Sequence, residues 1–295
     1  MTLLVGTASW TDKTLIDCGR FYPAGARTPE ARLRYYASRF PLVEVDSSYY
    51  AMPSAATAQR WAERTLYWRG TPAELRDELW RRFVAALAPL AHAGKLGLLH
   101  FQFAPWLVAD RAGRDYVRLF AERTAQAGFT ASVEFRHFSW FDGEARSADT
   151  LALLRELGAV HTVVDAPQGH EHGVPAVWAT THPRRALVRL HGRNAQSWGV
   201  QGASVAERFD YDYAEEELRA LAADIARLAG DADDTHVVFN NCREDAGQRN
   251  GRTLMRLLGL PAADEEPPSP PQGDAGGGRP AAPPPDGGPR TLDLF

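Results

Sequence analysis

Short apolar stretches alternate with longer amphipathic stretches along most of the chain. The short stretches are rich in Val, Leu, Phe and Tyr, as β-strands are. The longer stretches repeat their apolar residues with the period of a helix. The pattern predicts seven strands, at residues 3–10, 42–50, 96–106, 131–140, 159–167, 186–192 and 236–242.

Helices are expected between and after these strands, at residues 28–40, 54–64, 71–94, 114–128, 147–158, 213–230 and 246–259. Strands that alternate with helices form right-handed β-α-β units and a parallel sheet. We therefore expect an α/β fold, a TIM-like (β/α)8 barrel with one strand weak or absent. A doubly wound open sheet is the alternative, although no strand is followed by a glycine-rich motif for nucleotide phosphates.

The composition changes sharply after Leu260. Residues 261–290 are mainly Pro, Gly, Ala and acidic residues, which cannot bury enough apolar surface to form a core. We therefore expect one barrel domain over residues 1–260 and a disordered tail over residues 261–295.

Within the strands, apolar and polar residues alternate consistently. Successive strand residues point to opposite faces of a sheet. One face carries an apolar set: Val43, Val45, Leu99, Phe101, Val133, Phe135, Val188 and Leu190. The other face carries a polar set: Glu44, Asp46, His100, Gln102, Glu134, Arg136, Arg189 and His191. Because the outer face of a barrel packs under the helices, the polar set is predicted to face the interior, near the carboxyl ends of the strands.

Several ionisable groups in one interior are costly unless they pair or bind a ligand. In one interpretation they are structural pairs, Glu44 with Arg189 and Glu134 with Arg136. However, four strands that contribute charge exceed what packing requires, and this favours a ligand-binding or catalytic site.

Several segments also occur in a consistent order over residues 3–258: VGTASW, GRFYP, LRYYASRFPLVEVDSSYYAMPS, QRWAERT, GLLHFQFAPW, VEFRHFSWF, LVRLHGRN, and VFNN followed by QRN. These segments resemble the YecE-like family, domain of unknown function 72. The resemblance implies a TIM-like barrel without an established activity. It places the family's characteristic strand-end residues on Trp10, Glu44, Tyr49, Glu134, Arg136, Trp140, Arg189, His191, Asn240, Asn241 and Asn250.

One segment departs from the family pattern. After the RWAERT helix, family members have a third strand with a lysine at its end. Here only LYWR, residues 66–69, could replace that strand, and it offers no lysine. The sequence leaves open a gapped barrel, a short substitute strand or a damaged site.

For a catalytic cluster, Glu44 and Glu134 are the expected acid and base, because carboxylates in unlike surroundings can have separate pKa values. Arg136 and Arg189 would hold an anionic group through their forked donors. His191 would transfer protons, or would be a hydrogen-bonded structural residue.

Other candidates would bind the ligand. Asn240 and Asn241 offer amide donors for an oxyanion or a sugar hydroxyl, and Asn250 joins them through the resemblance. Aromatic residues would line the mouth or simply fill it: Trp10, Tyr49 and Trp140.

These residues predict a metal-independent enzyme of the hydrolase or lyase type, without cofactor, that acts on a small polar, anionic or sugar-like substrate. Paired carboxylates are compatible with glycoside hydrolysis. Metal-assisted hydrolysis of phosphate esters is an alternative, but the sequence shows no metal-ligand spacing. Its ligands would come from His100, His191, Glu44, Glu134 and Asp165.

The tail suggests a different class of function. It contains RTLDLF, which resembles the bacterial sliding-clamp-binding motif Gln-Leu-(Ser or Asp)-Leu-Phe, with Thr291 in place of Gln. The alternative function is therefore a non-catalytic, DNA-repair-associated module recruited to the clamp by Leu292, Asp293, Leu294 and Phe295. A chance apolar segment, or one that folds back on the barrel, is the simpler interpretation.

Composition limits the expected partners and cellular location of the protein. The net charge is −4 and no long basic run occurs, so direct nucleic acid binding is not expected. Two cysteines are too few for a disulfide framework, and the sequence shows neither a signal peptide nor a membrane span. We expect a cytoplasmic protein.

Overall fold

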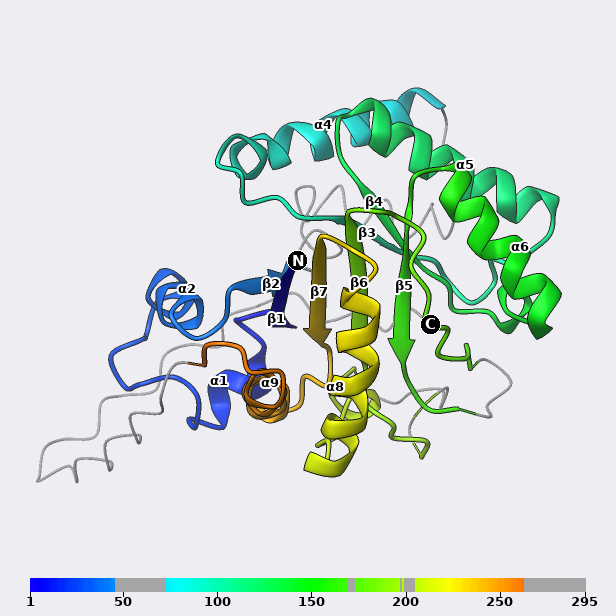
Figure 1. The fold of residues 1–295 in the computed structure, drawn as a ribbon. Helices are drawn as coiled ribbons and strands as arrows, with labels where there is room; N and C mark the ends of the chain where they lie inside the picture. Colours follow the sequence, from blue (N-terminus) through cyan, green and yellow to red (C-terminus); the bar gives the residue numbers. More distant parts are fainter. Residues whose placement is uncertain (46–72, 169–172, 197, 199–204, 263–295) are drawn as a thin grey trace, which may run out of the picture.

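The computed structural model describes residues 1–45, 73–168, 173–196, 198 and 205–262 (Figure 1). They contain seven strands: β1 (Thr2–Ala8), β2 (Leu42–Glu44), β3 (Leu99–Gln102), β4 (Ala131–Glu134), β5 (Val160–Asp165), β6 (Arg185–Leu190) and β7 (Asp234–Phe239). Each strand falls within or close to a predicted one and is shorter than expected.

The strands form one sheet in the order β2-β1-β7-β6-β5-β4-β3, and every neighbouring pair is parallel. The first strand therefore pairs with the last one, as in a barrel and unlike a doubly wound sheet. In the part of the chain that the structure describes, β2 and β3 are the edges. The LYWR segment that would supply the predicted third strand lies outside the described residues.

The described helices are α1 (Lys13–Asp17), α2 (Pro29–Ala37), α4 (Ala73–His92), α5 (Arg111–Gln126), α6 (Gly143–Glu156), α7 (Val205–Arg208), α8 (Glu215–Ala229) and α9 (Ala246–Leu257), with the 3-10 helix η3 (Phe138–Trp140). The helix predicted at residues 54–64 lies outside the described residues. The short helices α1 and α7 were not predicted.

Helices cover the outer face of the sheet. Helix α9 packs on β1 and β7, α8 on β6 and β7, α5 on β4, and α6 on β5 (Figure 1). Helix α8 shows why these helices pack on the sheet, because its buried residues recur with helical spacing on one face. They are Leu218, Leu221, Ala222, Ile225, Leu228 and Ala229.

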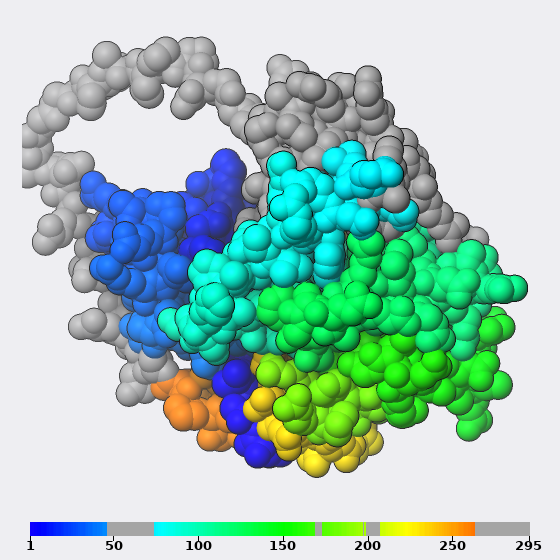
Figure 2. All heavy atoms as spheres, turned by 90° about the horizontal axis from the view of Figure 1, so that it is seen from above, coloured from blue at the N-terminus to red at the C-terminus, as the bar shows by residue number. Residues whose placement is uncertain are grey.

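Helix α4 differs from these helices because none of residues 74–92 is buried. It lies on the surface beside the segments that include α5, shown in cyan and green in Figure 2. No helix in the described ranges is long and apolar enough to cross a membrane.

The two faces of the sheet carry different residues, as the alternation predicts. Leu99, Val133, Phe135, Val188 and Leu190, from the apolar set, are buried. A separate small apolar cluster combines Ala8, Val160, Leu187 and Val238. Leu187 lies two residues before Arg189 on the same strand face, so apolar residues adjoin the polar set inside the curved sheet.

One member of the apolar set is an exception. Val45 is 46% exposed. Strand β2 ends at Glu44, so Val45 lies beyond the paired segment and the alternation no longer determines its environment.

Candidate functional site

The guanidinium of Arg189, on β6, contacts side chains from three other strands. Its Nε and Nη2 donate to Glu44 Oε2 (2.8 Å) and Oε1 (2.6 Å). Its Nη1 donates to Glu134 Oε2 (2.6 Å) and to Gln102 Oε1 (3.0 Å). Four of the five guanidinium N–H donors are therefore used by neighbouring side chains.

These contacts require a strongly curved sheet. Arg189 is on β6, the central strand, whereas Glu44 and Gln102 are on the two edge strands, β2 and β3. The predicted convergence of the polar side chains is thus present in the structure. The cluster formed by Glu44, His100, Gln102, Glu134, Arg136, Arg189 and His191 is called the Arg189 cluster below.

Contacts of β2 with α2 and β1 position Glu44 in the cluster. Tyr36 Oη accepts from Thr7 N (2.8 Å) and donates to Leu42 O (2.9 Å), which ties α2 to β1 and β2. At Gly6, a Cβ atom would lie 2.0 Å from the carbonyl oxygen of Leu42. Only glycine therefore allows β1 and β2 to approach so closely.

Glu134 is fully buried and accepts from three sides. Besides Arg189, its carboxylate contacts Arg136 Nη1 and His191 Nε2, each at 3.1 Å. Burial alone would raise the pKa of Glu134, but the Arg189 charge and the contacts with His191 and His100 together outweigh it and hold the pKa well below its usual value. Glu134 is therefore a carboxylate at neutral pH.

Glu44 is the more accessible carboxylate, with 16% of its side chain exposed. Burial alone would raise its pKa, but the charge and hydrogen bonds of Arg189, together with His100, outweigh burial and lower it. Neither Glu44 nor Glu134 is held protonated, in contrast to the expected pair of one acid and one base.

His191 is fixed by hydrogen bonds at both ring nitrogens. Its Nδ1 accepts from Asn240 Nδ2 (2.8 Å), so Nε2 carries the hydrogen and donates to Glu134. Burial lowers the pKa of His191 to about 4, which keeps the ring neutral. This arrangement fits the structural interpretation of His191 and leaves neither nitrogen available for proton transfer.

Arg136 extends the cluster outward. Besides its bond to Glu134, its guanidinium lies 4.8 Å from the ring centre of Trp198. The rings of Trp198 and Phe209 also cover His191, at 6.0 and 5.4 Å. The two carboxylates of the cluster are balanced by its two guanidiniums. Arg189, between two carboxylates, is not placed to hold an anion as expected; Arg136 retains further donors.

Asn241 and Asn250, also predicted to bind the ligand, hydrogen-bond to the protein itself. Asn241 Nδ2 donates to Tyr211 O (2.8 Å) and to Asn250 Oδ1 (2.7 Å). Asn250 Nδ2 donates to Tyr213 O (3.1 Å), and its Oδ1 accepts from Tyr213 N (3.2 Å). These amides hold the segment before α8, so in this structure they are not ligand donors.

Trp140 is part of the hydrophobic core. It has no exposed surface, stacks on Phe135 at 4.0 Å and donates from Nε1 to Leu107 O (2.7 Å). It therefore does not line the mouth. Trp10 is partly buried and packs against the cluster of buried residues that includes Tyr36 and Phe40. The remaining predicted residues lie outside the described ranges: Asp46, Tyr49, Leu292, Asp293, Leu294 and Phe295.

Asp165, suggested above as a metal ligand, belongs to a separate network. It accepts from Arg193 Nη2 (2.8 Å) and Tyr213 Oη (2.7 Å). Within the described ranges, no group of three or more His, Cys, Asp or Glu side chains is arranged to hold a metal ion.

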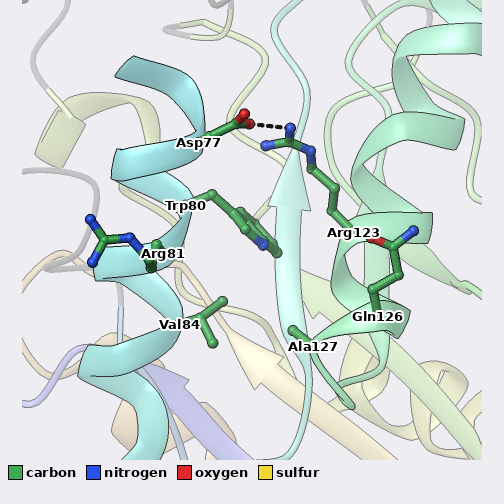
Figure 3. A pocket seen from close by; sticks show the side chains of 7 residues that line it. All are labelled: Asp77, Trp80, Arg81, Val84, Arg123, Gln126 and Ala127. Atoms are coloured by element: carbon green, nitrogen blue, oxygen red, sulfur yellow. Dashed lines mark hydrogen bonds and ion pairs between the residues drawn. The ribbon is translucent and has the colours of Figure 1, made fainter. Parts of the chain in front are cut away.

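A groove of about 450 Å³ lies between α4 and α5, and its lining includes none of the Arg189 cluster residues (Figure 3). An ion pair between Asp77 and Arg123 crosses it, and Trp80 and Val84 form its apolar part. None of its lining residues belongs to the polar set predicted from the sequence.

Sequence reasoning did not assign roles to Gln102, Trp198 and Phe209. Gln102 could have been included, because it occupies a polar position of the alternation and the equivalent strand position to Glu134. Trp198 and Phe209 follow β6 outside any periodic segment, so no sequence signal connects them to His191.

Comparison with known proteins gives the family. A family model described as "Protein of unknown function DUF72" matches residues 4–67 and 69–274. The chain belongs to the DUF72 family. The resemblance predicted from the motifs is thus confirmed.

Relatives of this DUF72 protein cover nearly the same length. The UPF0759 protein YunF of Bacillus subtilis (strain 168) is 29% identical over 279 residues, 88% of this chain and 95% of YunF. A DUF72 family protein from Thermotoga maritima MSB8 has a TM-score of 0.70 at 27% identity, covering 88% of this chain and 100% of that one. One from Enterococcus faecalis V583 has a TM-score of 0.73 at 23% identity, with coverage of 92% and 100%, and supports the fold alone.

Proposed function

We propose that this DUF72 protein is a metal-independent enzyme of the hydrolase or lyase type that acts on a small polar, sugar-like substrate, with Glu44 as the reacting carboxylate. The observation that carries the proposal is the unequal accessibility of two ionised carboxylates on one guanidinium. An ionised carboxylate can act as a base or nucleophile, or stabilise a positively charged transition state.

The neighbours of Glu44 support this division of roles. Glu134 is buried and its carboxylate bonds to Arg189, Arg136 and His191, which suits an anchor, whereas the carboxylate of Glu44 bonds to Arg189. Glu44, Arg136 and the exposed Gln102 present polar atoms on the accessible side of the cluster. Metal independence is supported by His191, because both of its nitrogens are committed to Asn240 and Glu134.

The full barrel is part of the same proposal. A strand from residues 66–69 between β2 and β3 would complete an eight-stranded barrel around the Arg189 cluster. Support comes from Arg189, whose contacts bring these two edge strands to one side chain.

Replacing Glu44 with glutamine should abolish turnover while leaving the fold intact. Glutamine keeps the shape of the side chain but cannot act as a base, and loss of such a group typically costs about 10²–10⁴-fold in kcat. Purified protein would be screened against 4-nitrophenyl glycosides and esters, and each hit would be repeated with Glu44→Gln. Thermal unfolding of each variant would verify folding.

The matched control is Glu156→Gln, which removes a carboxylate from an ion pair on the surface with Arg118. It should turn over each hit at the wild-type rate. Hits that Glu44→Gln processes as fast as the wild type would contradict the proposed role of Glu44.

A second candidate function rests on the tail sequence. We propose that Leu292, Leu294 and Phe295 anchor the protein to the bacterial sliding clamp, because apolar residues in a Pro- and Gly-rich segment serve no linker purpose. A labelled peptide of residues 286–295 should bind a purified clamp saturably in fluorescence polarisation. A peptide with Leu294→Ala and Phe295→Ala is the control. No binding of the native peptide at high micromolar clamp concentration would refute this candidate.

A further inference from the structure

Two aromatic side chains are exposed on the segments that follow β3 and β4, two strands that contribute to the Arg189 cluster. Trp106 is 40% exposed and Phe138 is 42% exposed. Trp106 follows Gln102 by four residues, and Phe138 follows Glu134 by four residues. Because β3 and β4 are neighbouring parallel strands, both aromatics lie on the same carboxyl-terminal rim.

The two segments that carry these aromatics, one of which includes η3, are joined to each other. Ala109 N donates to Ser139 Oγ (3.0 Å), and Trp140 Nε1 donates to Leu107 O (2.7 Å). The exposed rings also have supporting neighbours. Trp106 contacts the ring of Tyr116 at 6.2 Å, and Phe138 stacks on His137 at 4.7 Å. The two rings are therefore held at the rim in defined positions.

The charges of the Arg189 cluster limit what could bind there. A ligand carboxylate or phosphate prefers a free forked guanidinium, but Arg189 already serves Glu44, Glu134 and Gln102. Arg136, which retains further donors, is itself paired with Glu134 and lies over the ring of Trp198. Two carboxylates and two guanidiniums leave no net positive charge to attract an anion. The chain as a whole has a charge of −4. An uncharged ligand fits this environment better than an anionic one.

Hydroxyl groups match the remaining hydrogen-bonding atoms. Glu44 presents carboxylate oxygens as acceptors, and none of the described residues accepts from Nε2 of the exposed Gln102. A sugar ring offers hydroxyls that donate and accept, together with an apolar face that packs on aromatic rings.

We propose that the site accepts an uncharged glycan of at least two sugar rings. One ring places its hydroxyls on Glu44 and Gln102, and the adjoining rings pack on Trp106 and Phe138. The inference rests on the proposed function of Glu44 and extends it to a substrate class. Single-stranded nucleic acid also stacks on aromatic side chains, but it requires a positively charged groove along its phosphates, which this cluster does not provide.

The experiment uses the full chain on an array of neutral glucan, mannan, xylan and chitin oligosaccharides of increasing length, with phosphorylated and sulfated counterparts and oligothymidylate. The wild type should bind at least one neutral series, with tighter binding of oligosaccharides than of the monosaccharide. Trp106→Ala and Phe138→Ala should each weaken binding by about threefold to tenfold, the usual contribution of one aromatic stack. Leu33→Ala, which truncates an exposed side chain on α2, should bind as the wild type does.

Binding restricted to the anionic series or to oligothymidylate would overturn the proposal. Binding of neutral glycans by Trp106→Ala and Phe138→Ala with the affinity of the wild type would also overturn it. Glu44→Gln separates this inference from the proposed function. If neutral glycans bind through Trp106 and Phe138 but are never turned over, the ligand class is supported and the proposed catalytic role of Glu44 is contradicted. Glu44-dependent turnover of an anionic compound would support the proposed enzyme and contradict the neutral-glycan substrate class.

Discussion

Replacing Arg189 with methionine should destabilise the protein by about 3–5 kcal/mol, because the substitution leaves the largely buried Glu44 without a guanidinium partner and the buried Glu134 with Arg136 alone. Glu44 and Glu134 both bond to this guanidinium, and Glu134 has no exposed surface. Methionine fills a similar volume, so loss of packing contributes little. Urea unfolding at pH 7 would measure the change in the free energy of unfolding.

Two further variants identify the cause of the effect. Arg118→Met removes an exposed ion pair with Glu156 and should change stability by at most about 1 kcal/mol. Adding Glu44→Gln and Glu134→Gln to Arg189→Met should restore part of the loss, because the buried charges are then removed together. If Arg189→Met were as stable as Arg118→Met, the cluster would not be a buried ion network.

The protein should lose stability as the pH falls from about 6.5 to 4. Burial lowers the pKa of His161, His191 and His236 to about 4, from the ordinary histidine value of about 6.5. In this range the unfolded chain takes up protons that the folded protein does not, so unfolding becomes more favourable. At pH 5 each fully buried histidine accounts for up to about 2 kcal/mol. Urea unfolding at pH 7 and pH 5 would measure the sum.

Carboxylates extend the loss to lower pH. The pKa values of Glu44 and Glu134 are lower in the folded protein than their usual value, so their contribution is present above about pH 4.5 and disappears below it. His161→Phe should reduce the difference between pH 7 and pH 5, whereas His92→Phe, at an exposed position on α4, should not. An unchanged difference in His161→Phe would show that the buried imidazole does not cause the pH dependence.

The repeating pattern of the sequence was sufficient to predict the sheet and the inward-facing residues. Strands read from apolar runs gave all seven described strands, and alternation placed Glu44, Glu134 and Arg189 on one face. The pattern could not show which of these charges neutralise one another. That depends on the curvature of the sheet, which brings residues from its two edges to a single guanidinium.

The sequence-based predictions differ from the structure mainly at the carboxyl ends of the strands. The apolar run around Glu134 was extended to Trp140, but β4 stops at Glu134 and a 3-10 turn directs Trp140 into the core. Asn240 and Asn241 were assigned to one site although consecutive residues tend to point to opposite sides, and only Asn240 contacts His191. Stricter use of the alternation would have separated these two asparagines.

The contacts of Arg189 also bear on how the chain folds. Its three acceptors lie 145, 87 and 55 residues away in the sequence. Contacts at such separations raise the contact order and slow folding, because large loops must close before they form. The Arg189 bonds should therefore be among the last to form.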